Sequence, residues 1–161
     1  MIIDVGPKPA DVTLSWENLY SYNRKLLDPM SERFFFVAEP TKLIVKNVPK
    51  AFTVRLPLHP EKPEGGFRQY TVTPSGDNEV SFWMAKKDAD NMEAGKVVRL
   101  MELFNVRIEK VNADAVEAIF VSESYEDVRK TKAQLIQWIP IGEEYPCGVI
   151  LQDASAVEGF A

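Results

Sequence analysis

The sequence has almost none of the side chains that bind soft metals or form disulfides. Its 161 residues include one cysteine, Cys147, and one histidine, His59. A single cysteine excludes an internal disulfide and a zinc site built from several cysteines. Carboxylates alone would have to hold a metal ion, and the sequence contains no compact acidic loop of the calcium-binding kind. We therefore expect no metal site, and we expect Cys147 to be a small buried hydrophobic residue.

Long apolar runs are missing as well. No stretch approaches the ~20 apolar residues that a helix needs to span a bilayer. The start of the chain, MIIDVGPKPADV, lacks the basic residues and the apolar stretch of a signal peptide. These absences predict a cytoplasmic protein without a membrane segment. Apolar residues still make up 45% of the chain, which is enough to form the core of one medium domain or of two small, tightly joined ones.

Catalytic and nucleotide-binding motifs are also absent. The pair Gly65-Gly66 lacks the further glycine, the Lys-Ser/Thr ending and the following helix of a phosphate-binding loop. His59 has no GxSxG serine or reactive cysteine to act on. It stands in the stretch LPLHPEKPEGGFRQY, where prolines restrict φ and the glycine pair permits a sharp reversal. We therefore predict no catalytic residue, and we interpret His59 as packed or hydrogen-bonded at a rigid turn.

Positive charge is scarce overall, since the net charge is −5. The deficit is uneven along the chain. Residues 1–68 carry ten Lys and Arg against eight acids, whereas residues 69–161 carry nine against sixteen. Nucleic-acid affinity follows local basic surface rather than the total charge. The charge distribution therefore permits RNA binding without predicting it.

The sequence does contain many strand-like segments. In FTVRLPL, apolar and other residues alternate with the period of two that is typical of a half-buried strand. Within residues 96–111, the same alternation predicts that Phe104 and Val106 face opposite to Asn105. Turns are expected at 74–78 and 112–114. Strands are further expected at residues 33–38, 43–48, 68–73, 79–85, 96–111, 115–122, 133–140 and 147–152.

Helix signals are few. Residues 15–27 form one amphipathic helix, with Ser15 as N-cap and Asp28-Pro29 as the stop, and residues 86–95 are interpreted as a short helical connector. Many short strands with little helix indicate an all-β barrel or a pair of barrels. The run Phe34-Phe35-Phe36 is interpreted as a strand buried on both faces rather than as a stacking platform for bases. Trp138 is open to both interpretations.

Five stretches, taken in order, resemble the C-terminal anticodon-binding region of archaeal-type glutamyl-tRNA synthetases. They are WENLYSYNRKLLDPMSERFFFVAEPTKLIV, LPLHPEKPEGGFR, KVVRLMELFNVRIEKV, QLIQWIP and VEGFA. The similarity covers about residues 14 to 161, and the second stretch is also similar to glutaminyl-tRNA synthetases. The resemblance implies a mainly β fold, with tandem β-barrels preceded by one short α-helix.

The resemblance also implies a division of the chain. Residues 1–27 would form a helical lead-in from a catalytic half that is missing, and residues 28–161 the anticodon-binding barrels. The first barrel would comprise roughly residues 28–84 plus 134–161, and the second roughly residues 85–133. The HIGH-type and KMSKS-type ATP signatures are absent, so we expect an excised C-terminal portion that cannot activate glutamate by itself. ATP would be used only by the missing catalytic domain.

The resemblance implies candidate tRNA-binding residues. Arg33, Glu61, Arg99 and Met101 match anticodon-contacting positions of the glutaminyl branch, although Glu61 and Met101 depart from its polar or basic residues. Further candidates are Arg68, Lys62 and Glu158, the last of which stands where that branch has an amide.

For Arg33 and Arg99 the alternatives are an RNA contact or a structural ion pair, with Glu32 or Glu102 as the nearest acid. If they contact RNA, replacement by Ala should weaken tRNA binding far more than folding.

The expected function is therefore to bind the anticodon of tRNA for glutamate on behalf of a catalytic domain in cis, and the sequence leaves open whether tRNA for glutamine is bound as well. Two alternatives remain open from the sequence. The first is a freestanding β-barrel adaptor that binds RNA or protein, and the second is the equivalent part of a glutaminyl-tRNA synthetase.

Overall fold

The computed structural model describes residues 15–129, 131 and 133–161. The chain divides after Arg33 into two compact units, and each is described by itself. None of the described helices is long and apolar enough to cross a membrane.

The first unit contains the helix α2, Trp16–Leu27. Its N-cap is Ser15, whose side chain accepts a hydrogen bond from the backbone N–H of Asn18 at 3.3 Å. The helix ends at Asp28, whose N–H donates to the carbonyl of Arg24. Both ends confirm the predicted helix at residues 15–27. None of its residues is buried, so the apolar side of the helix stays exposed.

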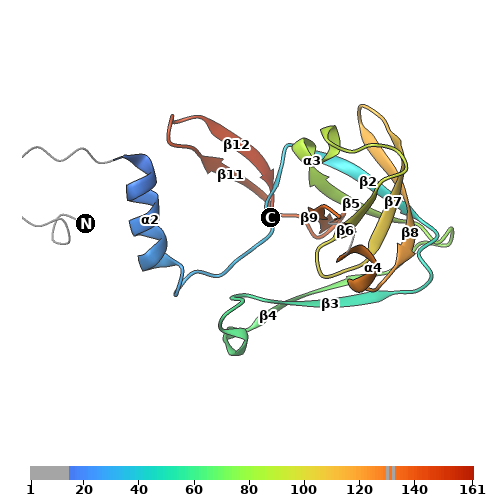
Figure 1. Ribbon diagram of the computed structural model, residues 1–161, viewed down its shortest axis with the longest axis horizontal. Coiled ribbons are helices and arrows are strands. Elements are labelled where there is room, and N and C mark those ends of the chain that lie inside the picture. The colour runs from blue at the N-terminus through green and yellow to red at the C-terminus, as the bar shows by residue number, and fades with distance from the viewer. Residues whose placement is uncertain (1–14, 130, 132) are drawn as a thin grey trace, which may run out of the picture. The chain divides into compact units, whose positions relative to one another are not determined.

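The second unit is built around a seven-stranded sheet (Figure 1). Its strand order is β10-β5-β2-β8-β7-β6-β9, with parallel pairs only at β2–β8 and β6–β9. The two edge strands, β9 and β10, are separated by only two residues of the chain, so the sheet curls back on itself. In order along the chain, the strands are β2 Pro40–Lys46, β5 Val80–Ala85, β6 Val97–Leu100, β7 Asn105–Val111, β8 Ala115–Ser122, β9 Leu135–Ile136 and β10 Ile139–Pro140.

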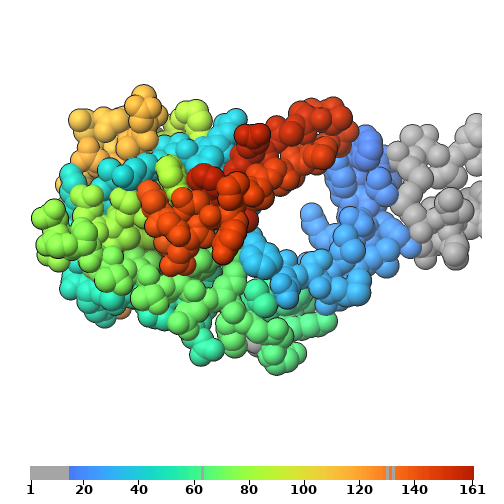
Figure 2. Space-filling model, turned by 180° about the vertical axis from the view of Figure 1, so that it is seen from behind, coloured from blue at the N-terminus to red at the C-terminus, as the bar shows by residue number. Residues whose placement is uncertain are grey.

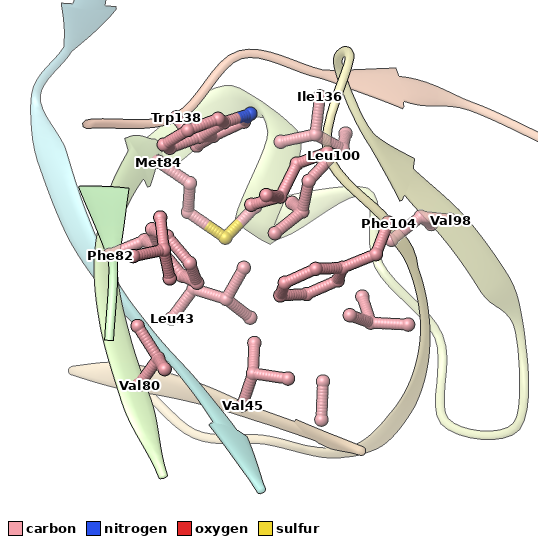
Figure 3. Packing of buried hydrophobic residues seen from close by; sticks show 14 of the residues in the cluster. Leu43, Val45, Val80, Phe82, Met84, Val98, Leu100, Phe104, Ile136 and Trp138 are labelled. Atoms are coloured by element: carbon pink, nitrogen blue, oxygen red, sulfur yellow. The ribbon is translucent and has the colours of Figure 1, made fainter. Parts of the chain in front are cut away.

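The hydrophobic core fills the inside of this curl (Figure 3). Trp138, between the two edge strands, is fully buried and packs edge-on against Phe82, with ring centroids 5.2 Å apart. Phe104 lies opposite and contacts Phe52 with a centroid distance of 5.2 Å. Aromatic pairs of this geometry add to the gain from apolar burial. The structure therefore assigns Trp138 to the core.

Two smaller sheets complete the second unit. The β3–β4 ribbon pairs Phe52–Pro57 with Phe67–Val72, and the three-stranded sheet has the order β1-β12-β11. Its strands are β1 Val37–Ala38, β11 Pro146–Ile150 and β12 Ala156–Phe160, and the β11–β12 hairpin projects from the body of the unit (Figure 2). The remaining helices are α3 Lys86–Asp90, α4 Glu126–Arg129 and the 3₁₀ turn η1 Pro63–Gly65.

Several local expectations are wrong. Residues 33–38 form a strand only at Val37–Ala38, and Phe34 is 55% exposed whereas Phe35 is buried. The aromatic run therefore does not lie entirely in the core, because consecutive side chains point to opposite sides. Cys147 is only half-buried, because β11 is the outer strand of its sheet.

The predicted strand at 96–111 is in fact a hairpin. A tight turn separates β6 from β7, with Glu102 at a φ of 57° and the N–H of Leu103 donating to the carbonyl of Leu100. The pairing of β7 with β8 shifts register between Asn105 and Val106. Asn105 is consequently fully buried, where strict alternation predicts that it faces away from the core.

The expected mainly β fold with one short helix before the strands is confirmed. The seven-stranded sheet takes β2 and β5 from the first predicted barrel range and β6, β7 and β8 from the second. The division into two barrels with the stated boundaries stays a prediction.

Candidate nucleic-acid interface

Arg99 lies at the centre of a buried polar network. Its guanidinium Nη1 donates to the Asn105 side-chain oxygen at 2.9 Å and to the Glu123 carbonyl at 3.1 Å. The amide of Asn105 donates in turn to the Ser122 hydroxyl at 2.9 Å and to the Ser124 carbonyl at 2.7 Å. Arg99 is 8% exposed, so its hydrogen bonds are made largely out of water. The network ties the loop after β8 to the β6–β7 hairpin.

An exposed aromatic ring covers this network from outside. The guanidinium carbon of Arg99 lies 5.4 Å from the ring centroid of Tyr125, which is 51% exposed. The expected acid partner, Glu102, makes no ion pair with Arg99, and among the described residues the partners of this arginine are an amide, a carbonyl and a ring. The expected ion pair with an acid is therefore wrong for Arg99, whose guanidinium donates to neutral acceptors instead. An RNA contact by Arg99 stays a prediction.

Met101 follows Arg99 at the turn between β6 and β7. Its backbone N–H donates to the Ile136 carbonyl at 3.0 Å, and its own carbonyl accepts from the indole N–H of Trp138 at 2.9 Å. Its side chain is half-buried against the core. The turn is therefore fixed from beneath by β9 and by the largest core residue.

The same β9 segment is also bound to α3. Gln134 donates from its side-chain amide to a carboxylate oxygen of Asp88 at 3.0 Å, while its carbonyl accepts from the N–H of Arg99 at 2.9 Å. Partial burial raises the pKa of Asp88 above its ordinary value of 3.8, although the Gln134 hydrogen bond acts in the opposite direction.

The loop between β3 and β4 carries Glu61 and Lys62, both exposed. Its inner residue is His59, 7% exposed, whose Nδ1 accepts from the N–H of Glu61 at 3.1 Å. The loop closes with bonds from the N–H of Lys62 to the His59 carbonyl and from the N–H of Leu58 to the Gly66 carbonyl, where Gly66 takes a φ of 125°. The interpretation of His59 as packed or hydrogen-bonded at a turn is confirmed by this geometry.

Arg68 is held between two rings. Its guanidinium carbon lies 5.1 Å from the centroid of Phe34 and 4.8 Å from that of Phe35. Its Nε is buried without a hydrogen-bond partner among the described residues. Arg68 is half-buried, so its terminal guanidinium nitrogens are the atoms available to bind a ligand.

Arg33 and Glu158 are the remaining candidates. Arg33 ends the first unit, where its Nη2 lies 2.6 Å from an oxygen of Asp28, with half of its side chain exposed. The structural partner is therefore Asp28 rather than the expected Glu32, and an exposed pair of this kind contributes little to stability. Glu158 is an exposed residue of β12, opposite Gly148, and its carbonyl accepts from the N–H of Glu39 at 3.0 Å.

Within the second unit the predicted site residues therefore lie at four places. Arg99 and Met101 share the β6–β7 hairpin, Glu61 and Lys62 share the β3–β4 loop, Arg68 lies on β4 and Glu158 on β12. Sequence reasoning missed Asn105 and Tyr125, which hold Arg99. A polar residue at a strand start does not reveal its burial, and Tyr125 is 26 positions away from Arg99. No group of three or more His, Cys, Asp or Glu among the described residues could hold a metal ion.

Comparison with known proteins identifies the family to which this chain is similar. A family model described as "tRNA synthetases class I (E and Q), anti-codon binding domain" matches residues 31–125. Glutamate–tRNA ligase of Pyrococcus abyssi is 42% identical over 153 residues, covering 95% of this chain and 25% of the relative.

Glutamate–tRNA ligases of two other organisms are also similar to this chain. The one of Methanocaldococcus jannaschii is 41% identical over 157 residues, covering 98% of this chain and 26% of the relative. The one of Methanococcus maripaludis strain S2 is 37% identical over all 161 residues, which make up 27% of the relative. The chain thus spans about a quarter of the length of these relatives. It belongs to the family of anticodon-binding domains of class I tRNA synthetases for glutamate and glutamine.

Proposed function

We propose that this chain binds the anticodon region of tRNA for glutamate as part of a glutamate–tRNA ligase. The observation that carries the proposal is the family match over residues 31–125, joined by relatives of 37–42% identity that are all named glutamate–tRNA ligases. The role is one of binding. The chain holds the anticodon end of the RNA so that the distant acceptor end reaches an active site elsewhere.

The proposal assigns the chemistry to residues outside this chain. A catalytic domain in cis would use ATP to activate glutamate, and the 161 residues of this chain would supply none of the reacting groups. The cytoplasmic location expected from the sequence belongs to the same proposal.

The geometry of the site supports a surface with fixed shape. Base recognition in single-stranded RNA needs donors and rings held in place, because the RNA bases themselves must be unstacked first. The hydrogen bonds of Arg99 and Asn105 fix the loop that carries Tyr125, and the bonds of His59 fix the loop that carries Glu61. Exposed groups on these two loops are therefore presented on a rigid frame.

The test is a binding comparison on the purified 161-residue chain. Fluorescence anisotropy would measure its affinity at one fixed salt concentration for transcribed glutamate tRNA, glutamine tRNA and a glutamate tRNA with an unrelated anticodon. We expect tighter binding to the first than to the third. Equal affinity for the second would extend the specificity to glutamine.

Equal and weak affinity for all three RNAs would contradict the proposal and favour the adaptor. Pyrophosphate exchange with glutamate and ATP, measured against heat-inactivated protein, should give no signal above background. A signal would show that the chain activates glutamate by itself.

A further inference from the structure

The β3–β4 ribbon has two different faces. One face carries Phe52, Val54, Leu56 and Val72, which are buried in the core cluster. The other face carries the cross-strand pairs Thr53–Thr71, Arg55–Gln69 and Pro57–Phe67. In Figure 1 the ribbon runs beneath the curled sheet, and none of the other described strands pairs with it. Its outer face is therefore a solvent-facing surface made of hydroxyl, amide, guanidinium and aromatic groups.

Arg55 is stacked on this outer face. Its guanidinium carbon lies 4.6 Å from the ring centroid of Phe67, which is 48% exposed although it is a large aromatic residue. Across the part of the chain that the structure describes, Arg55 has no carboxylate within ion-pair distance. Stacking orders the guanidinium plane while its N–H groups stay available. Five other basic side chains of this unit are paired with acids in the described structure, as Lys46 is with Glu117.

The local charge favours an anionic partner. Residues 50–76, which comprise the ribbon and its turns, contain four basic residues and two acidic ones, within a chain whose net charge is −5. Both acids, Glu61 and Glu64, lie in the loop at the end of the ribbon, so the two strands contain no carboxylate. A cation, a stacking ring and neutral hydrogen-bonding groups on one strand surface suit a nucleic-acid backbone with an unstacked base.

We propose that the outer face of the β3–β4 ribbon is a second RNA contact surface, centred on Arg55 and Phe67. Arg55 binds a phosphate of the RNA strand, and a neighbouring base stacks on the Arg55–Phe67 pair. Gln69 and the threonine hydroxyls, whose oxygens lie 3.4 Å apart, contact the sugar–phosphate chain beside it. This inference rests on the proposed function, because the RNA it commits to is the tRNA bound by the same chain.

The surface differs from the anticodon-reading candidates in position and in chemistry. None of those seven residues lies on the outer face, and Arg68, although on β4, belongs to the opposite face with its rings. A phosphate contact and a stacking contact carry little base specificity. The ribbon should therefore strengthen binding of any anticodon, whereas the reading residues should discriminate between anticodons.

The test uses the complete chain and two transcripts, glutamate tRNA and the same tRNA with an unrelated anticodon. Affinities of wild type, Arg55→Ala and Phe67→Ala are measured by anisotropy over a series of KCl concentrations. The matched control is Arg107→Ala, which removes another exposed arginine, from β7. Thermal melting of each variant accompanies the binding data, and Arg55→Gln replaces Arg55→Ala if the latter unfolds.

We expect Arg55→Ala to weaken binding of both transcripts by about tenfold and to reduce the slope of log affinity against log salt by about 1. Phe67→Ala should weaken both by about fivefold or more. The double variant should lose less than the product of the single losses, because the two side chains act as one stacked unit. Arg107→Ala should stay within about twofold of wild type.

The other outcomes show whether the ribbon surface, the proposed function or both are wrong. If wild type distinguishes the anticodons but Arg55→Ala behaves like Arg107→Ala, the ribbon surface is wrong and the proposed function stands. If Arg55→Ala affects only the cognate transcript, Arg55 is a base reader and the sequence-independent surface is wrong. If wild type binds neither transcript, the proposed function and this inference both fail.

Discussion

Replacement of Arg99 by Ala tests whether the buried network holds the β6–β7 hairpin to the loop after β8. The change removes two hydrogen bonds from a charged donor, each of which contributes about 1.5–3 kcal/mol in favourable cases. It also leaves the Asn105 side-chain oxygen with one donor fewer in a residue that is fully buried. Because neighbouring hydrogen bonds are not additive, we expect a loss of about 3 kcal/mol in the free energy of unfolding.

For a chain of 161 residues this loss corresponds to a fall of about 6–12 °C in melting temperature. Urea unfolding followed by tryptophan fluorescence measures the loss in free energy of unfolding, since Trp138 lies in the same core. The control is Arg33→Ala, which removes the other candidate arginine but only an exposed ion pair, and should cost less than about 1 kcal/mol.

The stability of these variants tests whether Arg99 stabilises the fold. The sequence-based expectation, which depends on an RNA contact, is that replacement of Arg99 weakens tRNA binding far more than folding, whereas its burial predicts a substantial cost to folding as well. If Arg99→Ala melts within about 1 °C of wild type, the network does not stabilise the fold and the reasoning is wrong. If it melts lower and an Asn105→Ala, Arg99→Ala double variant is no less stable than Arg99→Ala alone, the two side chains act through their shared bond.

Three further perturbations follow from single contacts. Asp88→Asn should raise the melting temperature at pH 7, since the raised pKa of Asp88 means that ionisation disfavours the folded state. The cost appears as pH rises from 3.8 through the folded pKa, so pH-dependent melts should show the gain vanish below 3.8. Trp138→Phe should cost about 1–3 kcal/mol in urea unfolding, because it leaves the Met101 carbonyl without its indole donor. Gly159→Ala should destabilise the three-stranded sheet by about 1–3 kcal/mol, because the added methyl overlaps the Val37 carbonyl oxygen, and hydrogen exchange of β1 and β12 would detect their separation.

Local signals predicted the elements better than their partners. The N-cap and the stop of α2 follow from residues within one turn of each other, and the turn at 74–78 has its expected backbone bonds. The turn of the hairpin at 96–111 could not be predicted from the sequence, because its residues Met101 and Glu102 are not Gly, Pro or Asn, the residues typical of turns. Its reversal depends on the bonds that Trp138 and Ile136 make to Met101 from another part of the chain.

The candidate site shows the same limit. Arg99 could be named from the family resemblance, but its burial depends on Asn105 entering the core at a register shift with β8. Glu123 and Tyr125, which complete its surroundings, lie on a loop more than twenty residues later. Pairing of Arg55 with Phe67 likewise depends on the register of two strands joined by a nine-residue loop.

The sequence by itself determined the mainly β character, the single capped helix, the rigid turn around His59 and the resemblance to the anticodon-binding family. These follow from periodicity, from capping and turn chemistry, and from the order of short motifs, all of which act over a few residues. Tertiary structure alone decided which polar side chains are buried, which partners Arg99 and Met101 take, and which ribbon face presents Arg55 and Phe67. Strand register and packing determine these features, because they bring together residues that have no relation in the local sequence.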